Sequence, residues 1–220
     1  MPPPATAYPV TLSVDYPEHK RNRLTAFFRL FTVIPIAIVS ALLTGFNANW
    51  NDRRWGSATW SGGDGWHYTY STMGVLFLAT LVMILFRQKY PKWWFDWNLA
   101  LTRFGTRVGS YFVLLRDEYP STDEEQAVHL DLRYPDVKKE LNRWLPLVKW
   151  LLAIPHYVVL AFLVIAAVFA TIFAWFAIVF AGSHPRSLFD FVVGVGRWAI
   201  RVGAYAFLLT TDRYPPFSLS

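Results

Sequence analysis

Two short stretches of the chain alternate strictly between apolar and polar residues. The first runs from Val10 to Tyr16, and the second runs from Val128 to Tyr134. A period of two with β-branched and aromatic residues on one face is typical of a half-buried β-strand. We expect the two strands to pair with each other in a small cytoplasmic ribbon. Because a two-stranded ribbon is only marginally stable alone, helices must cover one of its faces.

Three longer segments are apolar enough to enter a membrane. They cover about residues 24–46, 68–86 and 145–182, and their only formal charges, Arg29 and Lys149, lie near a segment start. About 20 apolar residues are needed to cross the hydrocarbon of a bilayer. The first two segments therefore predict a transmembrane helical hairpin over about residues 24–86. Long basic side chains such as Arg29 and Lys149 reach from this depth to the lipid headgroups by snorkelling.

Two further segments, about 92–115 and 186–209, have the period of an amphipathic helix with a narrow charged stripe and a wide apolar face. Such a helix lies in the membrane interface or packs beneath it. The stripe carries pairs of like charge four residues apart, Arg103 with Arg107 and Arg197 with Arg201. Like-charge pairs at this spacing are mildly destabilising alone, so we expect an anionic group beside them. Lipid phosphate is the first candidate, and the acidic linker residues 123–125 or carboxylates of a partner are the others.

The chain repeats itself. Ten residues of varied chemistry between Pro91 and Leu115 recur without gaps between Pro185 and Leu209, at the constant offset that separates the two prolines. We therefore expect a mainly α, integral membrane protein with two tandem repeats, residues 1–120 and 121–220. Each repeat has a strand, a basic amphipathic helix, a transmembrane helical hairpin and an Arg-bearing interfacial helix. The basic helices carry Lys20, Arg21 and Arg23 in the first copy, and Lys138, Lys139 and Arg143 in the second.

The third apolar segment, 145–182, allows two interpretations. It is too long for one comfortable span and barely long enough for two short ones. One interpretation is a helical hairpin that turns near Ala166 to Thr171, and the other is a single long helix after Pro155. We favour the hairpin, because the first repeat has two apolar segments at the equivalent place.

Composition and charge agree with a membrane location. The chain is 54% apolar and 18% aromatic, and only 16% of its residues are charged, against about 25% in ordinary soluble domains. Of its 21 Lys and Arg residues, all but Arg53 and Arg54 lie outside residues 47–69. The positive-inside rule then places both termini in the cytoplasm and the 47–69 loop outside. With a net charge of +6, anionic phospholipids are the expected partner rather than nucleic acid.

The outward loop is rich in tryptophan, with Trp50, Trp55, Trp60 and Trp66. Tryptophan belts at the headgroup level explain such a loop. A carbohydrate-stacking platform is a second interpretation, and a docking surface for another membrane subunit is a third.

The sequence contains no catalytic constellation. It has no cysteine, and none of its five histidines has a metal-ligand spacing to another. His156 follows Pro155 inside an apolar segment, and an ionisable residue at this depth is a functional hypothesis by default. It is a possible intramembrane ligand for the iron of haem or the magnesium of a pigment. The alternative is a neutral histidine bonded to a backbone carbonyl freed by Pro155. We expect no metal site and no cofactor otherwise.

Three segments carry a resemblance to a known family: Ile154-Pro155-His156-Tyr157, the Pro185 to Phe191 segment, and the terminal run from Leu208 to Leu219. The chain resembles an uncharacterised bacterial family of duplicated membrane proteins, known only as a domain of unknown function. The resemblance implies a bacterial inner-membrane location, and it brings no activity, cofactor or catalytic residue with it.

These observations predict a non-catalytic, multi-pass inner-membrane protein. We expect an accessory or scaffold subunit of a larger membrane complex, with other membrane subunits as partners. A small transporter or channel built from duplicated hairpins is one alternative. A lipid-organising membrane protein, acting through the paired arginines, is the other.

Overall fold

A computed structural model describes residues 8–17, 23–44, 72–122 and 124–220. They form eight helices and a two-stranded sheet. The strands are β1 (Val10–Val14) and β2 (Val128–Leu132), and the helices are α1 (Arg23–Phe27), α2 (Arg29–Thr44), α3 (Thr72–Arg87), α4 (Lys92–Phe112), α5 (Val137–Glu140), α6 (Pro146–Leu152), α7 (Ile154–Ala181) and α8 (Arg186–Ala206). The prediction of a mainly helical fold with a small sheet is confirmed.

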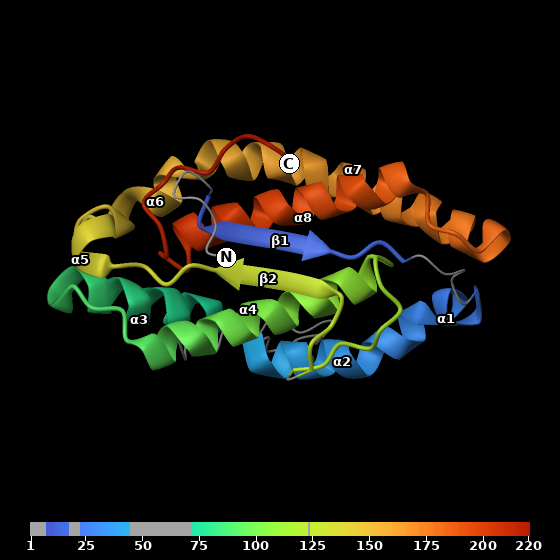
Figure 1. Cartoon of the computed structure of the whole chain (residues 1–220), viewed down its shortest axis with the longest axis horizontal. Coiled ribbons are helices and arrows are strands. Elements are labelled where there is room, and N and C mark those ends of the chain that lie inside the picture. The colour runs from blue at the N-terminus through green and yellow to red at the C-terminus, as the bar shows by residue number, and fades with distance from the viewer. Residues whose placement is uncertain (1–7, 18–22, 45–71, 123) are drawn as a thin grey trace, which may run out of the picture.

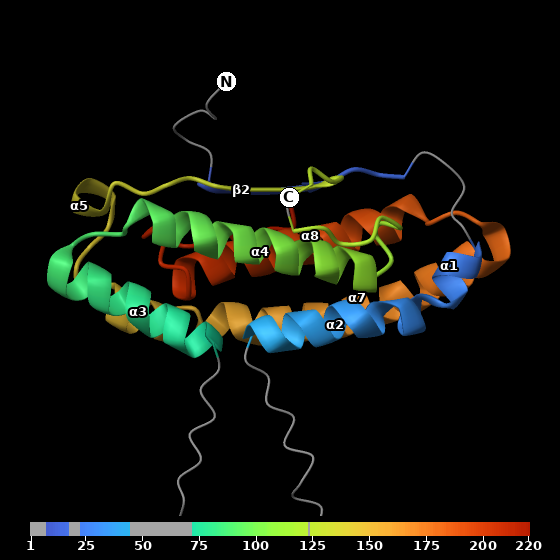
Figure 2. The same cartoon turned by 90° about the horizontal axis from the view of Figure 1, so that it is seen from below.

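The elements form three layers (Figures 1 and 2). The sheet is the first layer, α4 and α8 form the second beneath it, and α2, α3 and α7 form the third. The long axes of the strands and of the helices in all three layers run roughly parallel. The C-terminus lies on the sheet side, and Tyr8, the first described residue, donates a hydrogen bond from its hydroxyl to the Arg213 carbonyl. Both ends of the described chain therefore lie on one side.

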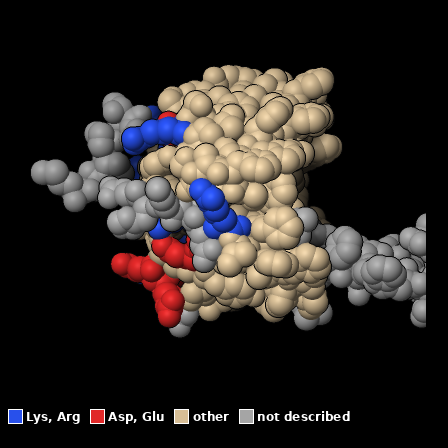
Figure 3. All heavy atoms as spheres, turned by 90° about the vertical axis from the view of Figure 1, so that its right-hand side faces the viewer, with Lys and Arg blue, Asp and Glu red and all other residues tan. Residues whose placement is uncertain are grey.

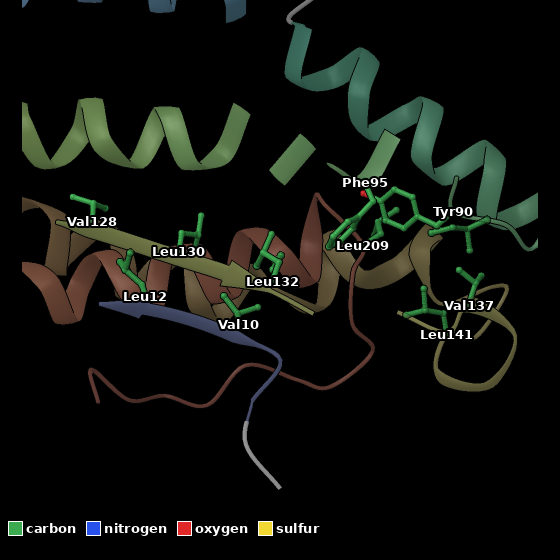
Figure 4. Close-up of a cluster of buried hydrophobic side chains, with 12 residues drawn as sticks. Val10, Leu12, Tyr90, Phe95, Val128, Leu130, Leu132, Val137, Leu141 and Leu209 are labelled. Atoms are coloured by element: carbon green, nitrogen blue, oxygen red, sulfur yellow. The ribbon is translucent and has the colours of Figure 1, made fainter. Parts of the chain in front are cut away.

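The two strands pair antiparallel, as predicted, with Val10 opposite Leu132 and Val14 opposite Val128. Their apolar side chains point toward the second layer, where they join Phe95 of α4 and Leu209, just after α8, in one buried cluster (Figure 4). The opposite face of the sheet is exposed and polar. It carries Thr11, Ser13, Asp15, His129, Asp131 and Arg133. The alternation in the sequence thus separates core from solvent.

The prediction of a hairpin within residues 145–182 is wrong. After the short helix α6, α7 continues without a turn from Ile154 to Ala181. Pro155 stands in the first turn, where a missing N–H costs nothing, and no glycine interrupts the helix before Gly182. Gly182 adopts a left-handed φ of 72° and donates its N–H to the Ile178 carbonyl, which is a common way for a helix to end. A turn at Ala166 to Thr171 would leave backbone N–H and C=O groups in apolar surroundings without hydrogen-bond partners.

The first two apolar segments, predicted as a hairpin over about residues 24–86, do not form two helices side by side either. In both views α2 and α3 follow one another along one line, opposite the single helix α7 (Figures 1 and 2).

The predicted basic amphipathic helix of the second half is also shorter than expected. It is the single turn α5, because Leu141 is extended (φ −118°, ψ 127°) and ends it before Arg143. Lys20 and Arg21 lie outside the described residues, and Arg23 begins α1.

Candidate functional site

The third layer presents an apolar surface of unusual extent. Its helices α2, α3 and α7 contain two Lys or Arg residues, Arg29 and Arg87, each at a helix end. α7 is long and apolar enough to cross a membrane. Its large side chains point outward over several sides, among them Phe162 (70% exposed), Phe173 (65%) and Phe180 (74%). Soluble monomers rarely expose contiguous apolar patches above a few hundred Å², so this surface is suited to lipid or to other membrane proteins.

Charge lies elsewhere on the molecule. On the end face in Figure 3, Lys, Arg, Asp and Glu gather toward one side, and the rest of the visible described surface carries none. The exposed face of the sheet is polar throughout and includes a hydrogen bond between His129 Nε2 and Asp15 Oδ2, 3.3 Å apart. The molecule therefore has a polar side and an apolar side, separated along the direction in which the layers stack.

The arginines predicted to bind an anion are turned toward the backbone of the other half. Arg103 of α4 donates from Nε to the Leu130 carbonyl of β2 at 2.8 Å. Arg197 of α8 donates from Nε to the Leu12 carbonyl of β1 at 3.0 Å. Arg103 also lies 3.5 Å from the Asp131 carboxylate. Each guanidinium thus fastens a helix to the strand above it, and the like charges that the sequence left unexplained have partners within the protein.

The second arginine of each pair reaches the segment that follows its own helix. Arg107 donates from Nη1 to the Ser121 carbonyl at 2.8 Å, and Arg201 Nη1 lies 3.5 Å from the Ser218 carbonyl. Burial, together with the nearby charge of Arg197, lowers the pKa of Arg201 below its ordinary value. All four arginines donate to backbone carbonyls within the protein. Their contact with lipid phosphate stays a prediction.

Two buried cations, Arg29 of α2 and Lys149 of α6, bind groups in segments far away in the chain. Arg29, at the start of α2, donates to the Tyr111 and Arg116 carbonyls at 2.8 and 2.6 Å, pairs with Asp117, and lies 4.0 Å from the Tyr111 ring. Its side chain is 4% exposed. The prediction that it snorkels to the headgroups is wrong, because carbonyls and a carboxylate inside the fold satisfy the guanidinium.

Lys149 of α6 makes the matching contacts in the second half. Its ammonium lies 2.6 Å from the Asp212 carboxylate, donates to the Thr211 carbonyl at 2.7 Å, and is 5.3 Å from the Tyr205 ring. The residue is fully buried, so it does not snorkel either. Burial lowers the pKa of Lys149 below its ordinary value, and the Asp212 carboxylate opposes that shift. The sequence signal for these two sites was that Arg29 and Lys149 are the only formal charges of the apolar segments, each near a segment start. Their acidic partners are far away in the chain.

A third pair of contacts joins the segment after the strand of each half to the segment before, and the first turn of, α8 or α4 in the other half. The Tyr16 hydroxyl donates to the His184 carbonyl, and the Tyr134 hydroxyl donates to the Tyr90 carbonyl, both at 2.5 Å. The ring of each tyrosine also meets a phenylalanine edge to face at 5.1 Å, Phe189 and Phe95 respectively. Sequence reasoning missed these contacts, because they depend on how the two halves are placed.

His156 is enclosed by aromatic rings. Trp198 Nε1 donates to His156 Nδ1 at 3.1 Å, and the Phe217 ring stacks on the imidazole with centroids 4.0 Å apart. The Tyr214 ring lies at 4.7 Å. The bond that orients the imidazole is thus to an indole, not to a carbonyl freed by Pro155. Since the side chain has no exposed surface, ligation of haem or a pigment would require these rings to move.

The predicted outward loop with Trp50, Trp55, Trp60 and Trp66 lies outside the described residues. Other tryptophans are exposed within them, including Trp93 and Trp97 of α4 and Trp144 and Trp150 around α6. Among the described residues, no group of three or more His, Asp or Glu side chains is arranged to hold a metal ion.

Comparison with known proteins identifies one related family. Residues 144–218 match the model of a family described as a domain of unknown function (DUF4389). This segment covers α6, α7, α8 and the terminal tail with Asp212 and Phe217. It includes two of the segments on which the sequence resemblance rests and all of the third except Leu219. No curated protein and no solved structure matches the chain. The match therefore supports an uncharacterised family and leaves the function to be argued from the geometry.

Proposed function

We propose that this protein is a non-catalytic membrane protein that rests in one leaflet of the bilayer and organises lipids there. Its third layer enters the hydrocarbon, and its sheet faces water. The observation that carries this proposal is the segregation of charge: α7 has no Lys, Arg, Asp or Glu, while the outer face of the sheet is polar throughout. Burying apolar side chains contributes about 25 cal/mol per Å², which favours this orientation over any that wets α7.

The direction of α7 argues that it lies along the membrane rather than across it. Its 28 residues make it about 42 Å long, enough to cross the hydrocarbon. However, α7 runs alongside the sheet (Figure 1), so a crossing α7 would draw the strands into the bilayer with it. A charged residue such as Asp131 or Arg133 costs about 3 kcal/mol at the bilayer centre. Lying flat in one leaflet avoids that cost.

The same orientation accounts for a duplicated architecture. We infer that the two halves are copies related by a two-fold axis that passes through the three layers, along the membrane normal. The paired contacts support this: Arg103 with Leu130 and Arg197 with Leu12, and the two buried cations with their carboxylates. The net charge of +6 favours the anionic cytoplasmic leaflet of a bacterial inner membrane, with both chain ends in the cytoplasm.

Single-cysteine labelling tests the orientation, because the chain has no cysteine of its own. Lys138→Cys and Ser183→Cys place exposed thiols before α6 and just after α7. Ser13→Cys marks the outer face of the sheet, and Phe169→Cys marks the exposed side of α7. A membrane-impermeant maleimide is added to inside-out vesicles and, in parallel, to right-side-out spheroplasts.

We expect Ser13, Lys138 and Ser183 to be labelled from the same side and Phe169 to be protected until detergent is added. Labelling of Lys138 and Ser183 from opposite sides would mean that α7 crosses the bilayer, and the proposal would then fail. Rapid labelling of Phe169 in vesicles would show that the apolar layer is not in lipid at all.

An accessory subunit is the second candidate, favoured by the many exposed phenylalanines of α7, which suit a partner's helices as well as lipid. Purification in mild detergent followed by mass spectrometry separates the two. Stoichiometric copurification of another membrane protein would favour the subunit role. A transport role gains no support from this arrangement, because a protein confined to one leaflet offers no path across it.

A further inference from the structure

A partly open apolar cavity of about 950 Å³ lies between α4, α7 and α8. Its walls come from α4 and α8 of the second layer, from α7, and from β1 above. Two glycines of α4, Gly105 and Gly109, open the wall on their side, since no atom lies within 4 Å of the place where a Cβ would stand. The volume is at the upper end of the range for small-molecule sites, about 300–1,000 Å³.

The lining gives an occupant almost nothing to bond with. Thr102 and Thr106 line the cavity, and their hydroxyls donate to carbonyls four residues back, Asn98 and Thr102, at 2.7 Å each. Most other lining side chains are aliphatic or aromatic. Arg29 contributes to one part of the wall, and its guanidinium is bonded to Tyr111, Arg116 and Asp117. Water needs two to four polar partners to occupy a cavity stably, so this cavity favours hydrocarbon.

The cavity is continuous with the apolar surface of α7. Val164, Val168, Ile172 and Phe176 line it, and the same four side chains are about half exposed, from 46% to 54%. In the proposed orientation these side chains meet the acyl chains of the leaflet. A flexible hydrocarbon chain can therefore pass from the bilayer into the cavity without crossing water.

We propose that this cavity binds one acyl chain of a membrane phospholipid, drawn from the leaflet in which the protein rests. The inference rests on the proposed function and deepens it, because it names the lipid-holding site. The bound chain would fill the space between α4, α7 and α8, while its headgroup stays at the level of the surrounding lipids. Organisation of lipid then means that the protein holds a phospholipid by its tail rather than by its phosphate.

Glycine substitutions supply the test with a matched control. Gly109→Leu and Gly105→Leu fill the cavity from α4 without meeting any atom at Cβ. Gly203 of α8 stands one repeat length from Gly109, also has no atom within 4 Å of its Cβ position, and is not part of the lining. Gly203→Leu therefore makes the same chemical change in the same kind of helix and leaves the cavity open.

Binding is measured with cis-parinaric acid, a fluorescent long-chain fatty acid, titrated into each variant in detergent, and by native mass spectrometry of phospholipid retained on purification. Each buried methylene is worth about 0.8 kcal/mol, or roughly fourfold in affinity. A leucine that displaces three or four methylenes is therefore expected to weaken binding about a hundredfold. Gly203→Leu is expected to bind as the wild type does.

Equal binding by all variants, or no binding of chain or phospholipid by the wild type, would overturn the inference. Flotation of each variant with vesicles of phosphatidylcholine and phosphatidylglycerol is measured in parallel. Wild-type protein that floats but binds no chain refutes the cavity site and leaves the membrane location intact. Wild-type protein that fails to float refutes the proposed function itself. Because Gly105→Leu and Gly109→Leu act on the cavity independently, misfolding of one of them leaves the other to decide.

Discussion

Loss of the buried ammonium of Lys149 should destabilise the fold far more than loss of an exposed one. The substitution Lys149→Met keeps the aliphatic stem and removes the charge that lies 2.6 Å from the Asp212 carboxylate. Lys149 is fully buried and the Asp212 side chain is 19% exposed. Breaking a buried ion pair from one side costs about 3–5 kcal/mol, and the residual exposure of Asp212 places this pair near the lower limit.

A thermal unfolding curve in detergent, followed by the fluorescence of the 11 tryptophans, measures the cost. For a chain of this size 1 kcal/mol shifts Tm by about 2–4 °C, so Lys149→Met should unfold about 6–12 °C below the wild type. Lys139→Met is the matched control. Its ammonium is exposed and 3.6 Å from Asp136, and such surface pairs contribute about 0.5 kcal/mol or less.

The double variant Lys149→Met with Asp212→Asn removes both charges and tests the cause. If the cost arises from an unpaired buried charge, the double variant should lose less stability than the two single variants together. The expected difference is about 2 kcal/mol. A strictly additive double variant, or a Lys149→Met protein as stable as Lys139→Met, would show that the ion pair does not fix α6 to the terminal segment.

Two further predictions concern the sheet side and the aromatic enclosure. Burial alone would raise the pKa of Glu118, but hydrogen bonds from Arg116 and the Ala127 N–H lower it below its ordinary value. The folded state thus favours the carboxylate, and the stabilisation is present above the ordinary pKa and lost as the pH falls through the folded value. Because Glu118 is 44% exposed, Glu118→Gln should cost only about 0.5 kcal/mol at neutral pH, and its Tm should equal the wild type's in acid. His156→Leu should lower the free energy of unfolding by about 1–3 kcal/mol, because it leaves the Trp198 N–H without a hydrogen-bond partner. If Trp198→Phe destabilises the His156→Leu variant as much as it destabilises the wild type, the hydrogen bond between them is not the cause.

The sequence by itself determined the local elements. The alternation from Val10 and from Val128 specified strands, because a period of two places every apolar side chain on one face. Pro91 and Pro185 set the starts of α4 and α8, since a proline is tolerated before the first turn and is unfavourable in a helix interior. The apolar character of 154–181 also indicated a membrane surface. These features depend on neighbours within a few residues, and such neighbours are visible in the sequence.

Other features depended on residues far apart in the chain, and only the tertiary structure decided them. Arg197 lies 185 residues from Leu12, whose carbonyl it binds, so the sequence suggested lipid phosphate for a charge that the fold satisfies internally. The choice between a hairpin and one helix at α7 was left open by composition. The structure forms a single helix, in which Leu160 and Ala170 pack with residues of α8. Lys149 was assigned to the membrane surface because its partner Asp212 is remote. A side chain's role is fixed by what surrounds it, and that environment is assembled by the fold.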